Sequence, residues 1–356
     1  MNASIVTDIE ILPLHAPLVQ PFRTALGQHD SLDNLLVRVV LADGTVGFGE
    51  AAIAAHITGE TVKQTRMNLL GVGRSVIGRD ARQYRKISAM LHEALPFNKA
   101  ALAGIEMALF DAVAKQKHLP LWKLFGCRCK PLRTDITIVI GDLREARMTA
   151  KEYYAKGFRA FKIKIGRDED LDFQRVIAVK RAVKHAKIYL DANQGYTAAM
   201  TLRFIDTLRK AGVRPAMIEQ PVPKEDREGL KKVTRLCAIP VCADESVRDL
   251  SDCKALIRDK AADIINIKLM KSGIVQSLQI VQAVRKAGLA LMIGGMMESS
   301  LAMTAAAHMA AGLGCFTYVD LDTPFFIKDG LRRNPYLNSR GVYDLKGVKT
   351  GIGVQV

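Results

Sequence analysis

Phe161-Lys162-Ile163-Lys164-Ile165-Gly166 is the stretch of sequence that decides the fold. Its two lysines lie two residues apart inside an apolar run, and in a β-strand such residues share a face. Lys162 and Lys164 therefore point one way and the apolar residues the other. Because buried lysine is rare unless it is paired, two inward ammonium groups predict the polar interior of a barrel covered by helices. A surface strand with two solvated lysines is the alternative.

Short apolar runs like this one recur from about Arg133 onwards. They lie at Asp135–Ile140, Ala160–Ile165, Lys187–Leu190, Ala216–Ile218, Ile239–Cys242, Asp263–Ile267, Ala290–Ile293 and Cys315–Val319. Segments with helical spacing alternate with them, at Ala146–Lys156, Asp172–His185, Thr197–Ala211, Lys224–Leu236, Asp249–Lys260, Val275–Ala287 and Ser299–Ala311. This alternation predicts an α/β fold with a closed (β/α)8 TIM-type barrel. An open doubly wound sheet would need a glycine-rich phosphate loop after its first strand, and Gly141-Asp142 is not one.

The chain outside the barrel forms two further units. Residues 1–50 alternate as a β-meander, with a loop predicted over Ala16–Asp33, and Thr61–Lys117 has helical spacing. After Pro324 the periodicity stops, which predicts a tail that returns to the first unit. The predicted domains are an α+β domain over residues 1–125, the barrel over 126–324 and a C-terminal segment over 325–356.

Composition narrows the class of protein. The net charge of +16 raises the question of nucleic-acid binding. The basic residues are spread along the chain, however, and no zinc-finger, helix-turn-helix or aromatic-interleaved motif accompanies them, which argues against a specific nucleic-acid partner. No apolar run reaches the roughly 18–20 residues of a membrane span. Met1–Leu14 lacks the pattern of a signal peptide, and the six cysteines lack C-x-x-C spacing, so a cytoplasmic enzyme with reduced thiols is expected.

Acidic residues follow three consecutive predicted strands. Asp191, Glu219 and Asp244 stand at the carboxyl ends of the third, fourth and fifth strands, where the active sites of TIM barrels lie. Three converging carboxylates need a counter-charge, and a hard cation with oxygen ligands and water meets that need, which predicts Mg2+. Three unrelated helix N-caps are the alternative.

Lysines end the second and sixth predicted strands, which are diametrically opposed in an eight-stranded ring. Lys164 and Lys268 would thus face a substrate from opposite sides. A neighbouring cation, either Lys162 or the metal, is expected to lower the pKa of such a lysine and make it a usable base. The metal would stabilise the enolate formed when a proton leaves the carbon next to a carboxylate. Two bases that face one carbon predict inversion at that carbon.

The motifs around these residues resemble the enolase superfamily, muconate-lactonizing subgroup, over essentially the whole chain. They are Lys162-Ile163-Lys164, Asp191-Ala192-Asn193-Gln194-Gly195, Glu219-Gln220-Pro221, Ala243-Asp244-Glu245-Ser246 and Ile267-Lys268. The resemblance implies a capping domain formed by the first unit and completed by the C-terminal tail. It also implies Mg2+ on the three carboxylates, Lys164 and Lys268 as the acid/base pair, and Lys162 on the substrate carboxylate. Asn193 and Glu245 would support the metal site from behind.

A second motif narrows the resemblance to the dipeptide epimerase family. Asp320-Leu321-Asp322-Thr323-Pro324 is similar to the Asp-x-Asp signature of that family, whose two aspartates bind the α-ammonium of the substrate. Two carboxylates on one face suit a protonated amine. Gly294–Glu298 and Ile57–Glu60 also resemble the family, and by position Thr137, Gly295 and Met297 would line the substrate site. The implied reaction is a 1,1-proton transfer that inverts the C-terminal residue of an L,L-dipeptide through an enolate.

The sequence leaves several alternatives open. Gly27 stands where family members that take alanyl-glutamate commonly have arginine, so an apolar second residue, or a cationic one answered by Asp30, is equally compatible. An o-succinylbenzoate synthase or N-acylamino-acid racemase would use the same lysines and metal, and muconate cycloisomerisation is more distant. A basic nucleic-acid-binding protein that keeps the barrel is the alternative from another class. Barrels of this kind often form homo-oligomers, although no residue indicates it here.

Overall fold

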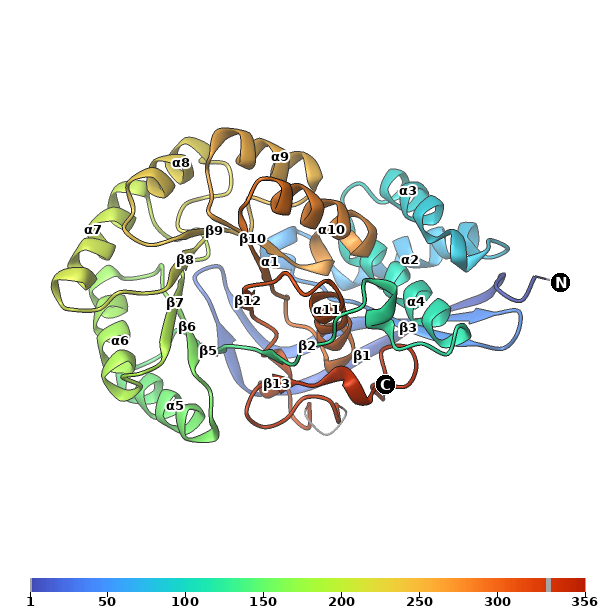
Figure 1. Ribbon diagram of the computed structural model, residues 1–356, viewed down its shortest axis with the longest axis horizontal. Helices are drawn as coiled ribbons and strands as arrows, with labels where there is room; N and C mark the ends of the chain where they lie inside the picture. Colours follow the sequence, from blue (N-terminus) through green and yellow to red (C-terminus); the bar gives the residue numbers. More distant parts are fainter. Residues whose placement is uncertain (1, 331–333, 356) are drawn as a thin grey trace.

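A curled, parallel eight-stranded sheet forms the centre of the protein, and helices cover its outer face (Figure 1). The computed structural model describes residues 2–330 and 334–355. The strands, in their order in the sheet, are β5 (Ile136–Ile138), β6 (Ala160–Lys164), β7 (Lys187–Asp191), β8 (Met217–Glu219), β9 (Val241–Ala243), β10 (Ile264–Ile267), β11 (Ala290–Ile293) and β12 (Tyr318–Val319). The helices between them are α5 (Leu143–Lys156), α6 (Glu169–Ala182), α7 (Ala198–Lys210), α8 (Arg227–Leu236), α9 (Leu250–Asp259), α10 (Leu269–Lys286) and α11 (Ser300–Leu313).

Hydrogen bonds join the two ends of the sheet. The N–H of Asp135, just before β5, donates to the carbonyl of Val319 in β12 at 3.0 Å. The N–H of Leu321 donates to Thr134 Oγ1 at 2.8 Å. The ring therefore closes, and the predicted TIM-type barrel is confirmed.

Strand β6 has the two faces that its sequence predicts. Phe161 and Ile163 are fully buried in the core between the barrel and its helices. Lys162 and Lys164 alternate with them and are also buried, with 3% and 6% of their surface exposed. Both lysines line the pocket at the barrel mouth. The alternative of a solvated surface strand is therefore wrong.

The first unit is a three-stranded antiparallel sheet with helices packed on it, and it lies beside the barrel (Figure 1). Its elements are β1 (Val6–Arg23), β2 (Gln28–Leu41), β3 (Val46–Ala51), α1 (Ala55–Thr58), α2 (Val62–Val76), α3 (Tyr84–Ala94) and α4 (Lys99–Gln116). Helix α4 is buried on every side and packs against β3 and α10. Gly49 permits this close approach, because a Cβ there would lie 2.0 Å from the carbonyl oxygen of Gly104 in α4.

The loop predicted over Ala16–Asp33 is wrong, because β1 and β2 continue through it as a long hairpin. Their pairing extends from Val6 opposite Leu41 to Arg23 opposite Gln28, with irregularities between Val6 and Asp8 and between Pro17 and Phe22. Strand β1 lies at the sheet edge, where proline is tolerated since no ladder hydrogen bond is lost. The carbonyl of Arg23 accepts a hydrogen bond from Ile140 N at 3.2 Å, so the hairpin tip reaches the barrel mouth.

The C-terminal segment contacts both the barrel and the first unit. Val342 in β13 (Val342–Tyr343) pairs with Arg133 in β4 (Leu132–Arg133). The N–H of Ile352 donates to Asp111 Oδ1 in α4 at 2.8 Å. The tail thus bonds to the first unit through Asp111.

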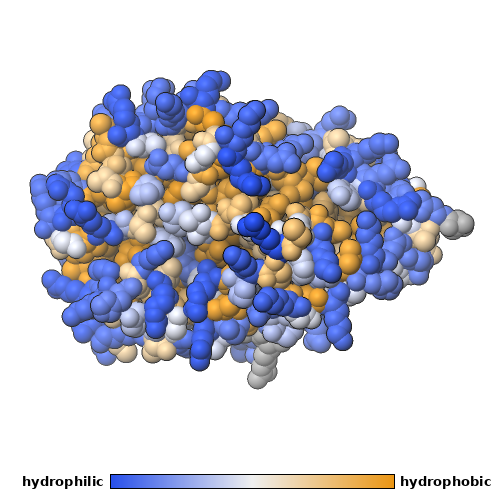
Figure 2. All heavy atoms as spheres, viewed as in Figure 1, coloured by the Kyte–Doolittle hydropathy of each residue, from blue (hydrophilic) through white to orange (hydrophobic). Residues whose placement is uncertain are grey.

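Figure 2 shows hydrophilic side chains over much of one face, with apolar side chains between them. Among the described residues, no helix is both long and apolar enough to cross a bilayer.

Candidate active site

A pocket lies at the carboxyl ends of the barrel strands, beneath the β1–β2 hairpin. All six predicted substrate contacts line it, namely Thr137, Lys162, Gly295, Met297, Asp320 and Asp322. So do Lys164, Lys268 and Asn193. The hairpin contributes Phe22, Thr24 and His29, and the segment after β3 contributes Ile57. Residues far apart in the sequence therefore surround one cavity.

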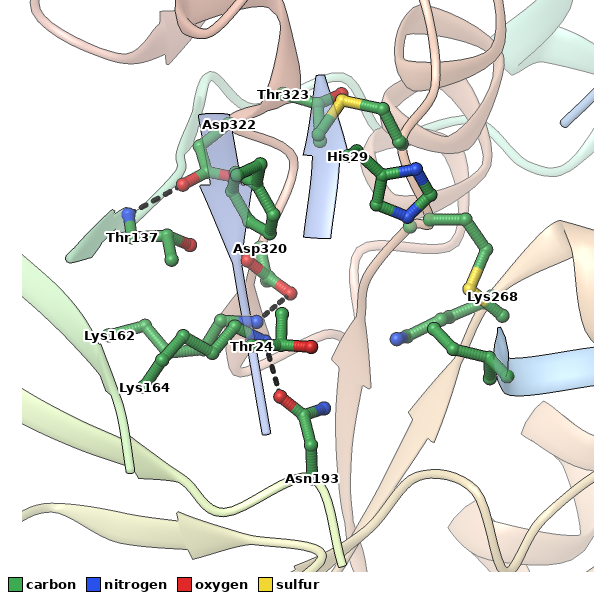
Figure 3. Close-up of a pocket in the computed structure, with 15 residues that line it drawn as sticks. Thr24, His29, Thr137, Lys162, Lys164, Asn193, Lys268, Asp320, Asp322 and Thr323 are labelled. Atoms are coloured by element: carbon green, nitrogen blue, oxygen red, sulfur yellow. Dashed lines mark hydrogen bonds and ion pairs between the residues drawn. The ribbon is translucent and has the colours of Figure 1, made fainter. Parts of the chain in front are cut away.

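The lysines enter this cavity from two sides. Lys162 and Lys164 come from β6 on one side, and Lys268 comes from the end of β10 on the other, with its nitrogen directed into the space between them (Figure 3). Lys164 Nζ donates to Asp191 Oδ2 at 2.6 Å and to Asn193 Oδ1 at 3.1 Å. Lys268 Nζ lies 2.7 Å from Asp244 Oδ2. The arrangement brings an amine to each side of whatever occupies the cavity.

The three predicted metal carboxylates lie on neighbouring strands below the cavity. Asp191 and Glu219 are register partners at the ends of β7 and β8, and Asp244 follows β9. Glu219 Oε1 accepts a hydrogen bond from Asn266 Nδ2 at 2.7 Å, whereas Oε2 is buried and accepts none from the described residues. An oxygen-only donor set with an unsatisfied buried oxygen suits a hard divalent cation.

The side chains of these three carboxylates are drawn towards lysines rather than towards one point. Among the described residues, the one acidic trio whose oxygens all lie within 4.8 Å of one another is Asp135, Asp320 and Asp322. Coordination of one ion by Asp191, Glu219 and Asp244 therefore requires their side chains to rotate inwards. Their role as metal ligands stays a prediction.

Electrostatics in the site differ from the expectation for Lys268. Burial opposes the charged form of Lys268, but Asp244 and Glu219 outweigh burial and raise its pKa. This direction is opposite to the one expected from the sequence, because the attraction between these carboxylates and the charged lysine exceeds the repulsion from neighbouring cations. Burial, followed by the charge of Asp191, raises the pKa of Glu219 to about 8. A divalent cation on the carboxylates would reverse the field that each of these groups experiences.

Asn193 and Glu245 connect the carboxylates to one another. The Asn193 N–H donates to Asp191 Oδ1 at 2.9 Å, and its side-chain amide donates to Glu245 Oε1 at 3.2 Å. Asn193 holds this position with a φ of 40°, a left-handed conformation that asparagine tolerates better than most residues. Burial, followed by Asp244, raises the pKa of Glu245 to about 7. Both side chains thus lie where they would hold the three predicted metal carboxylates in place.

Sequence reasoning missed a fourth buried lysine. Lys271 Nζ donates to Asp244 Oδ1 and to the Asp244 carbonyl, both at 2.7 Å, and to the Asn266 carbonyl at 2.9 Å. Burial opposes ionisation of Asp244, but Lys268 and Lys271 outweigh it and lower the pKa of that carboxyl. A lysine three residues after Lys268 in an apolar segment was the available signal. Lys271 and Asn266 fix the carboxylates at the ends of β8 and β9.

The Asp-x-Asp pair lies on the wall between β12 and β5. Lys162 Nζ donates to Asp320 Oδ2 (Figure 3). Thr137 N donates to Asp322 Oδ2 at 2.6 Å. Burial, followed by the charge of Asp320, raises the pKa of Asp322 to about 6. Two buried carboxylates with free oxygen lone pairs can receive a primary ammonium group.

The pocket wall nearest the first unit carries more apolar than polar side chains. Phe22, Ile57, Met296 and Met297 line this part of the pocket. Gly27 offers no side chain to it. Asp30, the expected partner for a cationic second residue, is exposed and accepts a hydrogen bond from Gln28 at 2.5 Å. This side of the pocket offers mainly apolar contacts, beside the hydroxyl of Thr24 and the imidazole of His29.

Known proteins match the chain over almost its entire length. Residues 7–126 match the family model of the mandelate racemase/muconate lactonizing enzyme N-terminal domain, and residues 145–356 match that of the enolase C-terminal domain-like family. A hydrophobic dipeptide epimerase of Citrifermentans bemidjiense is 46% identical, with 98% of this chain and 97% of that protein covered. An aromatic dipeptide epimerase of Herpetosiphon aurantiacus is 39% identical, with 96% of each covered.

A solved structure agrees with these matches. The crystal structure of the dipeptide epimerase of Enterococcus faecalis V583, complexed with Mg and the dipeptide L-Leu-L-Tyr, superposes with a TM-score of 0.94. It is 33% identical, and the superposition covers 99% of this chain and 100% of that one.

Proposed function

The chain belongs to the mandelate racemase/muconate lactonizing enzyme family of the enolase superfamily, and from that premise we propose that it is a Mg2+-dependent dipeptide epimerase. The observation that carries the proposal is the placement of Lys164 and Lys268 on opposite sides of one cavity, with Asp320 and Asp322 on its wall. The relatives named above support the same activity. Such an enzyme is an isomerase that inverts the α-carbon of the second residue of an L,L-dipeptide.

The residues of the chain divide the reaction among them. Asp320 and Asp322 bind the α-ammonium of the first residue, and Lys162 binds the carboxylate of the second. Lys164, as a neutral amine, removes the α-proton from one face, and Lys268, as an ammonium, returns a proton to the opposite face; in the reverse direction the roles exchange. Asp191, Glu219 and Asp244 would hold Mg2+, which supplies Lewis-acid stabilisation of the negative charge that develops on the substrate carboxylate.

The apolar wall selects the second residue. A glutamate side chain placed against Phe22, Ile57 and Met297 would lose its hydration without gaining a guanidinium partner, because Arg23 is bonded to Gln28 instead of lining the pocket. An apolar or aromatic second residue gains from the same contacts. We therefore propose dipeptides with such a second residue as the preferred substrates.

Two wider proposals accompany the activity. We propose a cytoplasmic enzyme. We also propose that it has no specific nucleic-acid partner, which the scattered distribution of its basic residues supports. Tight binding to a nucleic acid at physiological salt with a steep salt slope would contradict it. Sedimentation of the purified chain tests assembly into a homo-oligomer.

Incubation in D2O tests the proposed reaction. With Mg2+ and a library of L,L-dipeptides, we expect deuterium at the α-carbon of the second residue and accumulation of the L,D epimer, fastest for apolar second residues. N-succinyl and other N-acylamino acids serve as the comparison substrates. Exchange on those compounds with none on any dipeptide would transfer the assignment to the racemase alternative.

A further inference from the structure

A third buried aspartate accompanies the two that face the substrate ammonium. Asp135 immediately precedes β5, two residues before Thr137, and 1% of its surface is exposed. Oxygens of Asp135, Asp320 and Asp322 all lie within 4.8 Å of one another. Three carboxyl groups this close cannot all be ionised without counter-charges.

Within the described part of the chain, Asp135 lacks a hydrogen-bond donor, and Lys162, whose positive charge also acts on it, is bonded to Asp320 instead. Neither of its carboxyl oxygens accepts a hydrogen bond from the described residues. By contrast, Asp320 is bonded to Lys162 and Asp322 to the Thr137 N–H. Tyr189 in β7 interacts electrostatically with Asp135 and supplies no positive charge, and burial keeps its phenol neutral by raising its pKa. Of the three carboxyls, Asp135 is the one whose surroundings favour the neutral acid.

The contact between Asp135 and Asp320 needs a proton. An oxygen of each carboxyl group lies within 4.8 Å of the other, and no cation among the described residues is bonded to Asp135. Two carboxylates repel at that separation, whereas a carboxylic acid donates a short, charge-assisted hydrogen bond to a carboxylate. Burial, followed by the charge of Asp320, raises the pKa of Asp135 well above its usual range, in agreement with this geometry.

We propose that Asp135 is a protonated positioning residue of the ammonium site, which donates a hydrogen bond to Asp320 and fixes that carboxylate between Lys162 and the α-ammonium of the substrate. The proposal rests on the proposed function. It makes the receptor a group of three carboxyls that share one proton, so the site presents two negative charges to Lys162 and a primary ammonium. A substrate without the ammonium would leave one of these charges buried and uncompensated.

Two substitutions separate the protonated acid from other roles. Asp135→Asn keeps a donor of similar size without charge, and Asp135→Leu removes the donor at similar volume. We expect Asp135→Asn to keep the wild-type KM for an L,L-dipeptide within a factor of a few. Asp135→Leu should raise KM about 10-fold or more, the loss expected for one hydrogen bond to a charged group, with a smaller change in kcat. Asp206→Asn, on the exposed face of α7, controls for the removal of one carboxyl.

The kinetic outcomes decide between the alternatives. A wild-type KM in Asp135→Leu would overturn the proposal. Equal losses in Asp135→Asn and Asp135→Leu would also overturn it, because they would mean that an ionised carboxylate is needed, either for the ammonium or for a metal ion. Circular dichroism and urea unfolding of both variants exclude misfolding as the cause.

An infrared measurement tests Asp135 without using the activity. The difference spectrum between the wild type and Asp135→Asn at neutral pH should contain the C=O stretching band of a carboxylic acid, which shifts in D2O. Absence of that band would overturn the proposal for Asp135 while leaving the epimerase assignment intact. Conversely, a wild-type protein that shows the band but epimerises no dipeptide would refute the proposed function alone.

Discussion

Acidification is expected to loosen the C-terminal segment from the barrel through one buried histidine, His308 in α11. Its Nδ1 accepts a hydrogen bond from the Trp122 N–H, and its Nε2 lies 3.0 Å from the carbonyl oxygen of Ile352. The imidazole is fully buried, and its neutral Nε2–H tautomer satisfies both partners. A second proton would sit on Nδ1, facing a donor in place of an acceptor. The neutral ring therefore holds the tail and residues 121–124 to the barrel.

The magnitude follows from the pKa of this histidine. Burial lowers the pKa of His308 from 6.5 to about 4. The unfolded state therefore binds the proton first as the pH falls, so stability is fully present above about pH 6.5 and is lost as the pH approaches 4. At about 1.4 kcal/mol for each pKa unit, the total loss is about 3 kcal/mol, of which about 2 kcal/mol has occurred by pH 5.

Urea unfolding at about pH 7.5 and pH 5 measures this loss. His308→Asn should be less stable than the wild type at the higher pH, and the difference should narrow by about 2 kcal/mol at the lower pH because asparagine does not titrate. His185→Gln, at an exposed histidine, should leave the pH dependence as in the wild type. Burial also lowers the pKa of His92 to about 4, but His92 is present in every variant and cancels in the comparison. A difference that is equal at both pH values would refute the reasoning.

Four further outcomes are expected. Lys164→Ala and Lys268→Ala should each slow epimerisation at least ~10^2-fold, measured by the polarimetric rate, and full activity in both would contradict the two-base mechanism. Asp322→Asn should raise KM for dipeptides but leave any turnover of N-acylamino acids unchanged. Because burial raises the pKa of Asp322 to about 6, kcat/KM for dipeptides should fall as the pH drops below about 6, where the receptor loses its charge. Gly49→Ala should destabilise the protein by ~1–3 kcal/mol in urea unfolding, since its Cβ would meet the carbonyl of Gly104 in α4; an unchanged midpoint would contradict that close approach.

The strand rhythm predicted the barrel because each parallel strand is a short apolar run buried on both sides. The same logic failed for Ala16–Asp33, where two prolines and many polar residues are typical of a loop. That segment is a strand because of its neighbours. Strand β1 pairs with β2 on one side, and on the other the Val19 N–H donates to the Phe326 carbonyl and the Lys328 N–H donates to the Pro17 carbonyl. Pairing between distant segments leaves little trace in local composition.

Residues of the site were predictable where the two-residue period of a strand and a position at its carboxyl end coincide, as for Lys162 and Lys164. The missed residues are partners rather than reactants. Lys271 follows a strand by several residues, and only the fold brings its nitrogen to Asp244. Asp135 stands before its strand, where sequence rules expect structural residues instead of a wall of the active site. Contacts of this kind depend on how the barrel strands align when the ring closes. The sequence predicts the closed ring but not the register between its strands.

The buried charges of the barrel give the separate proposals one physical cause. Carboxyl groups outnumber lysines around the cavity, and every one of these groups is buried. The acids are Asp135, Asp191, Glu219, Asp244, Glu245, Asp320 and Asp322, and the lysines are Lys162, Lys164, Lys268 and Lys271. An excess of buried negative charge is tolerated only if protons or cations neutralise it. A divalent cation at one end and a substrate ammonium with a proton on Asp135 at the other reduce the same excess, so removal of any one of the three leaves more negative charge and should strengthen the electrostatic binding of the other two.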